Sequence, residues 1–241
     1  MATLTGAPVV PLPGVRAGVF LLPGPPTVLI DCGMRGQGKP IRAALATASL
    51  APQDLALIAL THWHIDHVGG LRAIRRQSPA RVVAHRADAP IIMGTTRPNK
   101  PRLTGEGGKF ARWLLLKLYQ TSTVDRLLED GDILAETGGL HVVATPGHTP
   151  GHVCYLLPNA GILFVGDALV NRHGELAVSP EGFSDDPPQA RRSLEALRAL
   201  RYDQCYFGHG EPLLEHADAQ VCTFLDRLAE AEATAGAEEA Q

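Results

Sequence analysis

The chain has 241 residues, of which 45% are hydrophobic and 20% are charged, and its formal net charge is −3. This composition is typical of a globular protein with enough apolar material for a large core, and it excludes a wholly disordered chain. The small acidic excess and the 5% aromatic content argue against nucleic acid or an anionic membrane as a partner. We therefore expect a small-molecule substrate, and the sequence leaves open whether the chain forms a homodimer.

The N-terminus and the cysteines favour a cytoplasmic location. The first residues lack the basic start and apolar run of a secretory signal, and no stretch approaches the 18 consecutive apolar residues of a membrane span. The cysteines form no C-x-x-C pair and lie in or beside apolar runs; they are Cys32, Cys154, Cys205 and Cys222. We expect them to be reduced thiols.

Apolar runs bounded by turn residues predict the strands, and Ala-rich or amphipathic segments predict the helices. The expected strands lie at 15–22, 27–30, 55–60, 80–84, 140–144, 153–157, 162–165 and 204–207. The expected helices lie at 39–49, 70–77, 187–201 and 213–230, and the third has Asp186 as its N-cap and Pro187 as its first residue. The strands fall into two groups flanked by helices. This order predicts mixed sheets packed together with helices outside, in one domain over residues 1–230, with a disordered tail at 231–241.

The segment 61–70 (THWHIDHVGG) follows the wholly apolar run 55–60. It places three imidazoles and a carboxylate within six residues, at His62, His64, Asp66 and His67. A loop at the end of a buried strand can turn several side chains toward one point. Imidazole and carboxylate together suit zinc, iron or manganese better than calcium or magnesium, so the segment predicts a metal site.

Three later segments repeat the placement of a histidine or an aspartate at the end of a strand. These are 145–152 (TPGHTPGH), which contains His148, then Gly166-Asp167, and finally Gly208-His209-Gly210. Glycine permits the close backbone approach that such turns require. We expect the four strand ends to converge on one rim of the scaffold.

The H-x-H-x-D-H loop, the TPGHTPGH turn, the Gly-Asp pair and the late Gly-His-Gly resemble the metallo-β-lactamase fold superfamily, in particular its glyoxalase II-like and lactonase-like hydrolases. The resemblance covers about residues 15–215. It implies an α+β fold, a four-layer αββα sandwich with a dinuclear metal site at the rims of the two sheets. It assigns one metal to His62, His64 and His148, the second to Asp66, His67 and His209, and a bridging role to Asp167. Two zinc ions are expected, with iron or manganese as alternatives.

The resemblance implies a hydrolase in which a metal-bridging hydroxide attacks the carbonyl of a small ester, lactone or thioester. A metal lowers the pKa of bound water to about 7, which makes hydroxide available at neutral pH. Asp66 is the candidate catalytic residue that passes a proton to the leaving group. Only 32 residues follow His209, too few for the glutathione-binding helical extension of glyoxalase II, so we do not expect specificity for a glutathione thioester.

Three other functions stay open at this stage. A persulfide dioxygenase-like oxidoreductase would hold one iron with two histidines and one aspartate, and open positions at such a site suit O₂ chemistry. A phosphodiesterase of the same fold is the second, because a dinuclear clamp also suits phosphoryl transfer. A non-enzymatic module would predict lost ligands, and none is lost.

Several residues outside the ligand set carry separate expectations. His152 and Asp31 are interpreted as supporting residues, His85 as structural, His141 and His216 as surface residues, and His173 as equally suited to the pocket or to a loop. Residues 94–108 predict a loop whose basic cluster (Arg97, Lys100 and Arg102) is expected to be solvated. Residues 109–119, with Trp113 and Leu116, are compatible with a lid, a dimer contact or a core helix.

Overall fold

The computed structural model describes residues 9–12, 17–98 and 119–239, with side chains as far as residue 234. The loop expected at 94–108 is described only over 94–98, where it has no regular structure. The apolar segment 109–118, with Trp113 and Leu116, lies outside the described residues.

The first sheet has six strands in the order β1-β2-β3-β4-β5-β6. Their bounds are Val10–Pro11, Phe20–Leu22, Thr27–Ile30, Leu55–Ala59, Arg81–His85 and Arg126–Leu128. The pairs β1–β2 and β2–β3 are antiparallel, whereas β3 to β6 run parallel to one another. The carboxyl ends of the central strands therefore meet at one edge.

The second sheet has five strands in the order β13-β10-β9-β8-β7. Their bounds are Gln204–Phe207, Ile162–Gly166, Val153–Leu157, Leu140–Ala144 and Ile133–Leu134. Only the β10–β13 pair is parallel. A separate hairpin is formed by β11 (Leu169–Arg172) and β12 (Glu175–Val178).

Alternation along the strands divides the core into three clusters. In β3, Val28 and Ile30 point between the two sheets, whereas Leu29 points to the outer face. In β9, Tyr155 points between the sheets and Cys154 points outward. Each sheet is therefore buried on both faces, which explains why runs such as 55–60 and 153–157 are wholly apolar.

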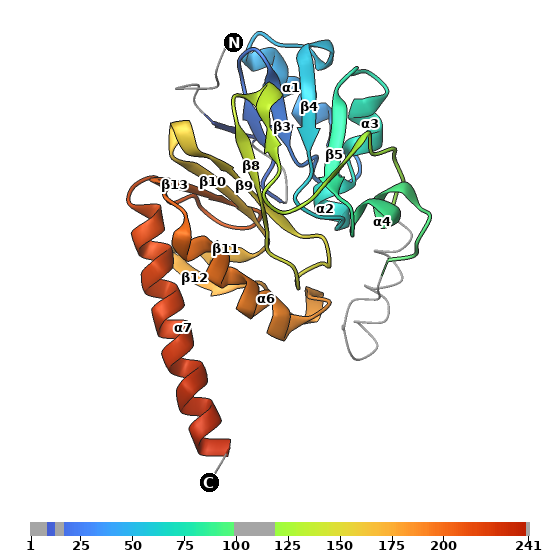
Figure 1. Ribbon diagram of the computed structural model, residues 1–241. Helices are drawn as coiled ribbons and strands as arrows, with labels where there is room; N and C mark the ends of the chain where they lie inside the picture. Colours follow the sequence, from blue (N-terminus) through green and yellow to red (C-terminus); the bar gives the residue numbers. More distant parts are fainter. Residues whose placement is uncertain (1–8, 13–16, 99–118, 240–241) are drawn as a thin grey trace.

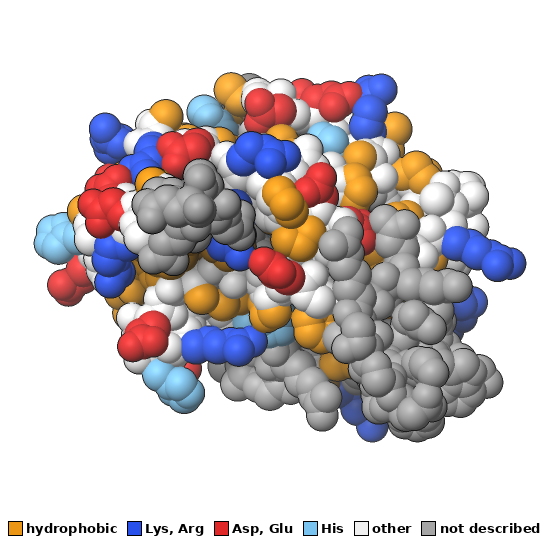
Figure 2. Space-filling view, turned by 90° about the horizontal axis from the view of Figure 1, so that it is seen from below, with side chains coloured by type: hydrophobic (Ala, Val, Ile, Leu, Met, Phe, Trp, Pro, Cys, Tyr) orange, Lys and Arg blue, Asp and Glu red, His pale blue; other side chains and the backbone are white. Residues whose placement is uncertain are grey.

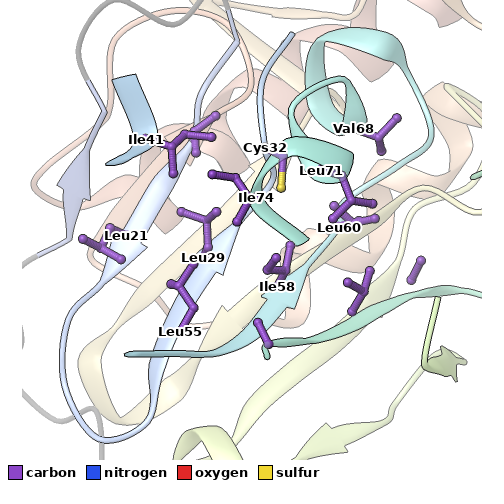
Figure 3. Packing of buried hydrophobic residues seen from close by; sticks show 14 of the residues in the cluster. Leu21, Leu29, Cys32, Ile41, Leu55, Ile58, Leu60, Val68, Leu71 and Ile74 are labelled. Carbon is purple, nitrogen blue, oxygen red and sulfur yellow. The ribbon is translucent and has the colours of Figure 1, made fainter. Parts of the chain in front are cut away.

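Helices cover the outer faces of both sheets (Figure 1). On the first sheet these are α1 (Gly38–Thr47), α2 (Ile65–Val68), α3 (Leu71–Arg75) and α4 (Ala89–Met93). Figure 3 shows Ile41 of α1 and Leu71 and Ile74 of α3 gathered over Leu29 and Ile58 of the sheet. On the second sheet, α6 (Pro187–Ser193), the 3₁₀ helix η5 (Leu194–Ala199) and α7 (Ala217–Glu239) fill this position, and α7 extends beyond the body of the molecule.

The layers are thus helix, sheet, sheet, helix, and the predicted αββα sandwich of two mixed sheets is confirmed. Strands β8, β9 and β13 have the predicted bounds, and Asp186 caps α6 by accepting a hydrogen bond from the Gln189 N–H at 3.0 Å. The remaining short elements are the 3₁₀ helices η1 (Pro52–Asp54), η2 (Ala135–Thr137), η3 (Pro158–Ala160) and η4 (Glu181–Phe183).

The C-terminal prediction was wrong at both of its boundaries. The last helix begins at Ala217 rather than at 213, and it continues to Glu239 where a disordered tail was expected from residue 231. The physical reason is composition: residues 229–239 are mostly alanine and glutamate, which have among the highest helix propensities.

The four cysteines are free thiols, as expected. Among the described helices, none combines the length and the apolar character needed to cross a lipid bilayer. Figure 2 shows that, on the face seen from below, Lys and Arg side chains intermingle with Asp and Glu. The described part of this face therefore has no large field of one charge.

Candidate metal centre

The predicted site residues lie at the ends of four strands. His62 and His64 follow β4, and the short helix α2 carries Asp66 and His67. From the second sheet, the turn between β8 and β9 carries His148, Asp167 follows β10, and His209 follows β13. The site therefore lies where the rims of the two sheets meet, and residues separated by up to 147 positions come together.

The seven predicted residues form two triads of possible ligand atoms. His62, His64 and His148 offer atoms that lie within 4.8 Å of one another, and so do Asp66, His67 and His209. A third such group joins His62, His67 and Asp167.

Asp167 lies between the two triads. Its Oδ1 is 3.3 Å from His67 Nε2, and its Oδ2 is 3.6 Å from His148 Nε2 and 3.3 Å from His209 Nε2. One carboxylate thus contacts members of both triads, which is the geometry that a bridging ligand requires.

The tautomer of His62 is set by a chain of hydrogen bonds. Asp31 Oδ2 accepts from the Thr61 hydroxyl at 2.7 Å, and Asp31 Oδ1 accepts from the Thr61 N–H at 2.8 Å. Because the hydroxyl proton is used in this way, Thr61 Oγ1 accepts from His62 Nδ1 at 3.0 Å. His62 Nε2 is then left as a bare lone pair.

Asp31 also orients His67. The His67 Nδ1–H donates to Asp31 Oδ2 at 2.7 Å, which leaves Nε2 facing Asp167. The backbone of Asp31 has φ of +58°, a left-handed conformation that aspartate adopts more readily than most residues. Asp31 therefore supports the site from outside the two triads, as the sequence suggested.

The second sheet uses a different supporting residue. His152 is fully buried, and its Nε2 accepts from the backbone N–H of Asp167 at 3.0 Å. Its other nitrogen, Nδ1, therefore donates to Thr145 Oγ1 at 2.8 Å. Burial lowers the pKa of His152 to about 3, so this ring stays neutral and holds Asp167 in place. The expectation that His152 supports the site agrees with this geometry.

Burial and neighbouring imidazoles keep the first triad uncharged. Burial lowers the pKa of His62 and His148 well below the usual value, and nearby histidines act in the same direction. Burial also lowers the pKa of His64 to about 4. All three rings are therefore neutral at pH 7, which is the form that binds metals.

The carboxylates dominate the electrostatics of the second triad. Hydrogen bonds to Asp167 and Asp66 raise the pKa of His209 to about 9. Burial acts to lower the pKa of His67, but the charges of Asp167 and Asp31 outweigh it and raise that pKa well above the usual value. Burial acts to raise the pKa of Asp66, but contact with His209 and the charge of His67 hold it at about 2.

Three buried atoms show that the residues fit divalent metal ions. His62 Nε2, His67 Nε2 and Asp167 Oδ1 are shielded from solvent and make no hydrogen bond of regular geometry, although the last two face each other at 3.3 Å. Buried polar atoms without a partner are rare and require an explanation. Imidazole nitrogen and carboxylate oxygen are ligand atoms that zinc, iron and manganese bind, so a cation at this point would give each of the three atoms a partner.

Solvent exposure differs between the residues of the cluster. The side chains of His67, His148 and Asp167 are at most 7% exposed, whereas those of Asp66 and His209 are 28% and 33% exposed. Asp66 and His209, together with the partly exposed His64 of the first triad, are therefore the members of the cluster that a substrate can reach.

The other histidines lie away from this cluster. His173 is exposed at the turn between β11 and β12, with φ of +57°, so the structure favours the loop interpretation over the pocket. His216 is exposed and His141 is partly exposed. His85 ends β5, where its Nε2 lies 3.7 Å from Glu129 Oε2.

The sequence interpretation missed several supporting residues. Thr61 and Thr145 relay hydrogen bonds to the histidines, and Ser184 Oγ lies 3.3 Å from His148 Nδ1. Asp88, which is described further below, was not singled out at all. Single threonines, serines and aspartates carry no local pattern that marks them as partners of a histidine, and Ser184 is 36 residues away from His148.

Comparison with known proteins identifies the family to which the chain belongs. The family model described as the metallo-beta-lactamase superfamily matches residues 19–209, which include all seven candidate ligands. The chain belongs to the metallo-beta-lactamase superfamily, whose members are generally hydrolases and typically bind metal ions.

Named relatives support the same class. The chain is 29% identical over 204 residues to the probable metallo-hydrolase YflN of Bacillus subtilis, covering 77% of this chain and 76% of that protein. It is 26% identical to the thioesterase pkgB of Emericella nidulans (83% of this chain, 50% of that protein). It is 35% identical to a hydroxyacylglutathione hydrolase of Maricaulis maris (65% of this chain, 48% of that protein). The chain thus spans only about half the length of the latter two relatives.

Solved structures show the same fold. A metallo-beta-lactamase of Cronobacter sakazakii with a HARLDQ motif matches with a TM-score of 0.71 at 21% identity, covering 100% of this chain and 95% of that chain. A subclass B3 metallo-beta-lactamase of Bradyrhizobium japonicum matches with a TM-score of 0.65 at 22% identity, covering 93% and 89%.

Proposed function

We propose that the protein is a dinuclear metal-dependent hydrolase of a small ester, lactone or thioester. The observation that carries the proposal is the pair of triads that share Asp167, because two adjacent ligand sets with one bridging carboxylate suit two ions rather than one. His62, His64 and His148 would hold the first ion, and Asp66, His67 and His209 the second. Zinc suits these donors best, with iron or manganese as alternatives.

The chain's own residues would supply positioning and proton transfer. Bound divalent ions polarise a carbonyl group and lower the pKa of water, which is the chemistry that acyl hydrolysis needs. Asp31 and His152 hold the ligands, so little reorganisation is required when a substrate arrives. The names of two relatives, a thioesterase and a hydroxyacylglutathione hydrolase, favour a thioester as the first substrate class to test.

Asp66 is the proposed proton donor to the leaving group. Its side chain is 28% exposed, and its Oδ2 lies 3.3 Å from His209 Nε2. Because the pKa of Asp66 is held at about 2, its carboxylate is ionised at pH 7 and would first take a proton from the attacking water and then pass it to the leaving group. We expect Asp66→Asn with full metal content to turn over more slowly, and unchanged turnover would remove this role.

A matched substrate panel tests the reaction class. The zinc-loaded protein is offered a butanoyl thioester, a butanoyl ester and γ-butyrolactone, and product is followed before and after chelation. We expect hydrolysis of at least one of the three, loss of this activity with the chelator and recovery with added zinc. No hydrolysis of any of the three by protein that holds two ions would overturn the proposal.

A further inference from the structure

Asp88 is a buried carboxylate that belongs to neither triad. Asp88 is 1% exposed and directly precedes α4 (Ala89–Met93). Its two oxygens accept three hydrogen bonds. Oδ2 accepts from the Trp63 N–H at 3.0 Å and from the Thr149 hydroxyl at 2.6 Å, and Oδ1 accepts from the Gly151 N–H at 2.7 Å.

The three donors come from the two loops that carry the first triad. Trp63 lies between His62 and His64, in the loop that follows β4 of the first sheet. Thr149 is next to His148, and Gly151 is three residues after His148, in the turn between β8 and β9 of the second sheet. One side chain therefore joins loops of both sheets at the point where the triad is assembled.

Asp88 is itself fixed by the backbone of the first sheet. Its N–H donates to His85 O at 3.1 Å, and its C=O accepts from the N–H groups of Ile91 and Ile92 at 3.0 and 3.1 Å. Because β5 and the first turn of α4 hold the residue from both sides, the carboxylate has a defined position against which the two loops can align.

The arrangement requires a carboxylate and a glycine. Asp88 accepts in each of the three hydrogen bonds, so an asparagine in the same position would turn its NH₂ group toward at least one N–H or O–H donor. A Cβ on Gly151 would lie 2.6 Å from Asp88 N and 2.7 Å from Asp88 Oδ1, which leaves no room for a larger residue. Neither requirement comes from the fold of the strands themselves.

We propose that Asp88 is a positioning residue of the metal centre, which sets the separation between His62 and His64 on one loop and His148 on the other. The distance that it controls is the 2.9 Å between His64 Nδ1 and His148 Nε2. The proposal rests on the proposed function, because it takes these histidines to be metal ligands. Replacing a residue that orients a metal ligand typically lowers the metal affinity about 10–100-fold.

Metal titration of the apoprotein tests this role without any substrate. Cobalt(II) is added to chelator-treated protein, its visible absorption bands report the ligand geometry, and zinc competition gives the affinity. The variants are Asp88→Asn, Thr149→Val and Thr149→Ser. The control is Thr137→Val, at the end of η2 and outside the ligand loops, which removes a fully buried hydroxyl that accepts from Leu140 N and donates to Leu134 O.

We expect Asp88→Asn to lower the affinity about 10–100-fold and to shift the cobalt bands. Thr149→Val should show a smaller loss of the same kind, and Thr149→Ser, which keeps the hydroxyl, should restore both values. Thr137→Val should match the wild type in affinity and spectrum even if it unfolds at lower temperature.

Two results would overturn the proposal, and a third would contradict the proposed function on which it rests. The first is a zinc affinity and cobalt bands in Asp88→Asn that equal those of the wild type. If that variant does not fold, wild-type values in Thr149→Val lead to the same conclusion. An equal loss in Thr137→Val would reduce the effect to general destabilisation. A wild-type protein that binds no cobalt and no zinc would instead contradict the proposed function itself, so the two failures are distinguishable.

Discussion

His62, His67 and His148 each present Nε2 to the centre of the candidate site because a specific partner lies against Nδ1. Asp31 has the largest part in this, since it orients His67 directly and His62 through Thr61. Its carboxylate accepts three hydrogen bonds from two residues. The chemistry of the ligands is thus decided by residues that would not contact the metals.

Replacing Asp31 with asparagine is expected to weaken the centre without removing any ligand. Its NH₂ group must face at least one N–H or O–H donor, so a buried group loses its partner. We expect the free energy of unfolding to fall by about 1–3 kcal/mol and the zinc affinity by about 10–100-fold. Urea unfolding and chelator competition measure the two quantities. Asp54→Asn, at an exposed carboxylate that accepts from Ala51 N, should leave both unchanged; an equal loss there would count against the account.

The raised pKa values of the second triad predict proton release on metal binding. At pH 7, His209, with a pKa of about 9, and His67, with a pKa well above its usual value, carry protons in the apoprotein. The rings of the first triad are already neutral. Loading both sites at pH 7 should therefore release about two protons, and affinity should rise with pH toward about 9.

Calorimetric titration with zinc in buffers of different ionisation enthalpy counts these protons. No release at pH 7, or an affinity that falls between pH 6 and pH 8, would contradict the electrostatics assigned to His67 and His209.

The candidate ligands were predictable and most of their supports were not. His62, His64, Asp66 and His67 lie within six residues, and the other three candidates each follow an apolar run, so spacing indicated a metal site and the family resemblance assigned the ligands. Asp88 contacts residues 25 to 63 positions away. The contacts with Thr149 and Gly151 form only once the two sheets have packed, and no local pattern indicates any of the three.

At the scale of elements, the turn between β8 and β9 depends on Gly147. Its φ is +129°, and a Cβ at this position would overlap the backbone of Ala190 in α6. The same turn is tied to the start of α6 by backbone hydrogen bonds from Asp185 N to His148 O (3.1 Å) and from Asp186 N to Gly147 O (2.9 Å). The helix and the His148 turn are therefore placed together.

Gly147→Ala is expected to disturb both the turn and α6. Its matched control is Gly139→Ala, where φ is +98° and a Cβ would meet nothing within 4 Å. The control should lose about 1–2 kcal/mol of unfolding free energy from backbone strain alone. Gly147→Ala should lose more than this and should also bind zinc more weakly. Equal effects of the two substitutions on stability and on zinc affinity would show that the contact with α6 does not matter.

Elements with strong patterns were predicted best. Strands β8, β9 and β13 are apolar runs between turn residues, and their bounds agree with the prediction. The two-residue strands β1 and β7 are too short to carry an alternation. The predicted helix 187–201 divides into α6 and the 3₁₀ helix η5 at Leu194, a change of hydrogen bonding that propensity does not report.

At the scale of the whole molecule, the centre joins the two halves of the sandwich. Four of the seven candidate ligands follow the first sheet and three follow the second. The same rim has a further link, since the Tyr155 hydroxyl of the second sheet donates to Leu60 O at 2.7 Å. Ions bound between the rims would therefore stabilise the packing of one sheet against the other.

Metal binding should accordingly raise the unfolding temperature. A ligand that binds only the folded state at 100 times its Kd adds about 2.7 kcal/mol of stability. We expect the midpoint of thermal unfolding to rise on zinc addition, to fall again with a chelator, and to respond far less in His148→Ala. A midpoint that is the same with zinc and with chelator would show that the two halves do not need the ions.

The arrangement of the whole molecule was predicted in outline. Two groups of strands flanked by helices indicated packed sheets, and the four-layer sandwich followed from the family resemblance. The pairing order β13-β10-β9-β8-β7 was not predicted, because the parallel pairing of β10 with β13 joins segments about 40 residues apart. Because the central strands are wholly apolar, the sequence also does not indicate which of their side chains face the other sheet and which face the helices.

The central claim is that one chain holds two metal ions between its sheets. Elemental mass spectrometry on untagged protein, purified without added metal and weighed against chain concentration, tests it directly. The account predicts about two divalent ions per chain, with zinc as the main element. One iron per chain would contradict it. So would folded protein that is purified without metal and then binds only one zinc ion per chain on titration.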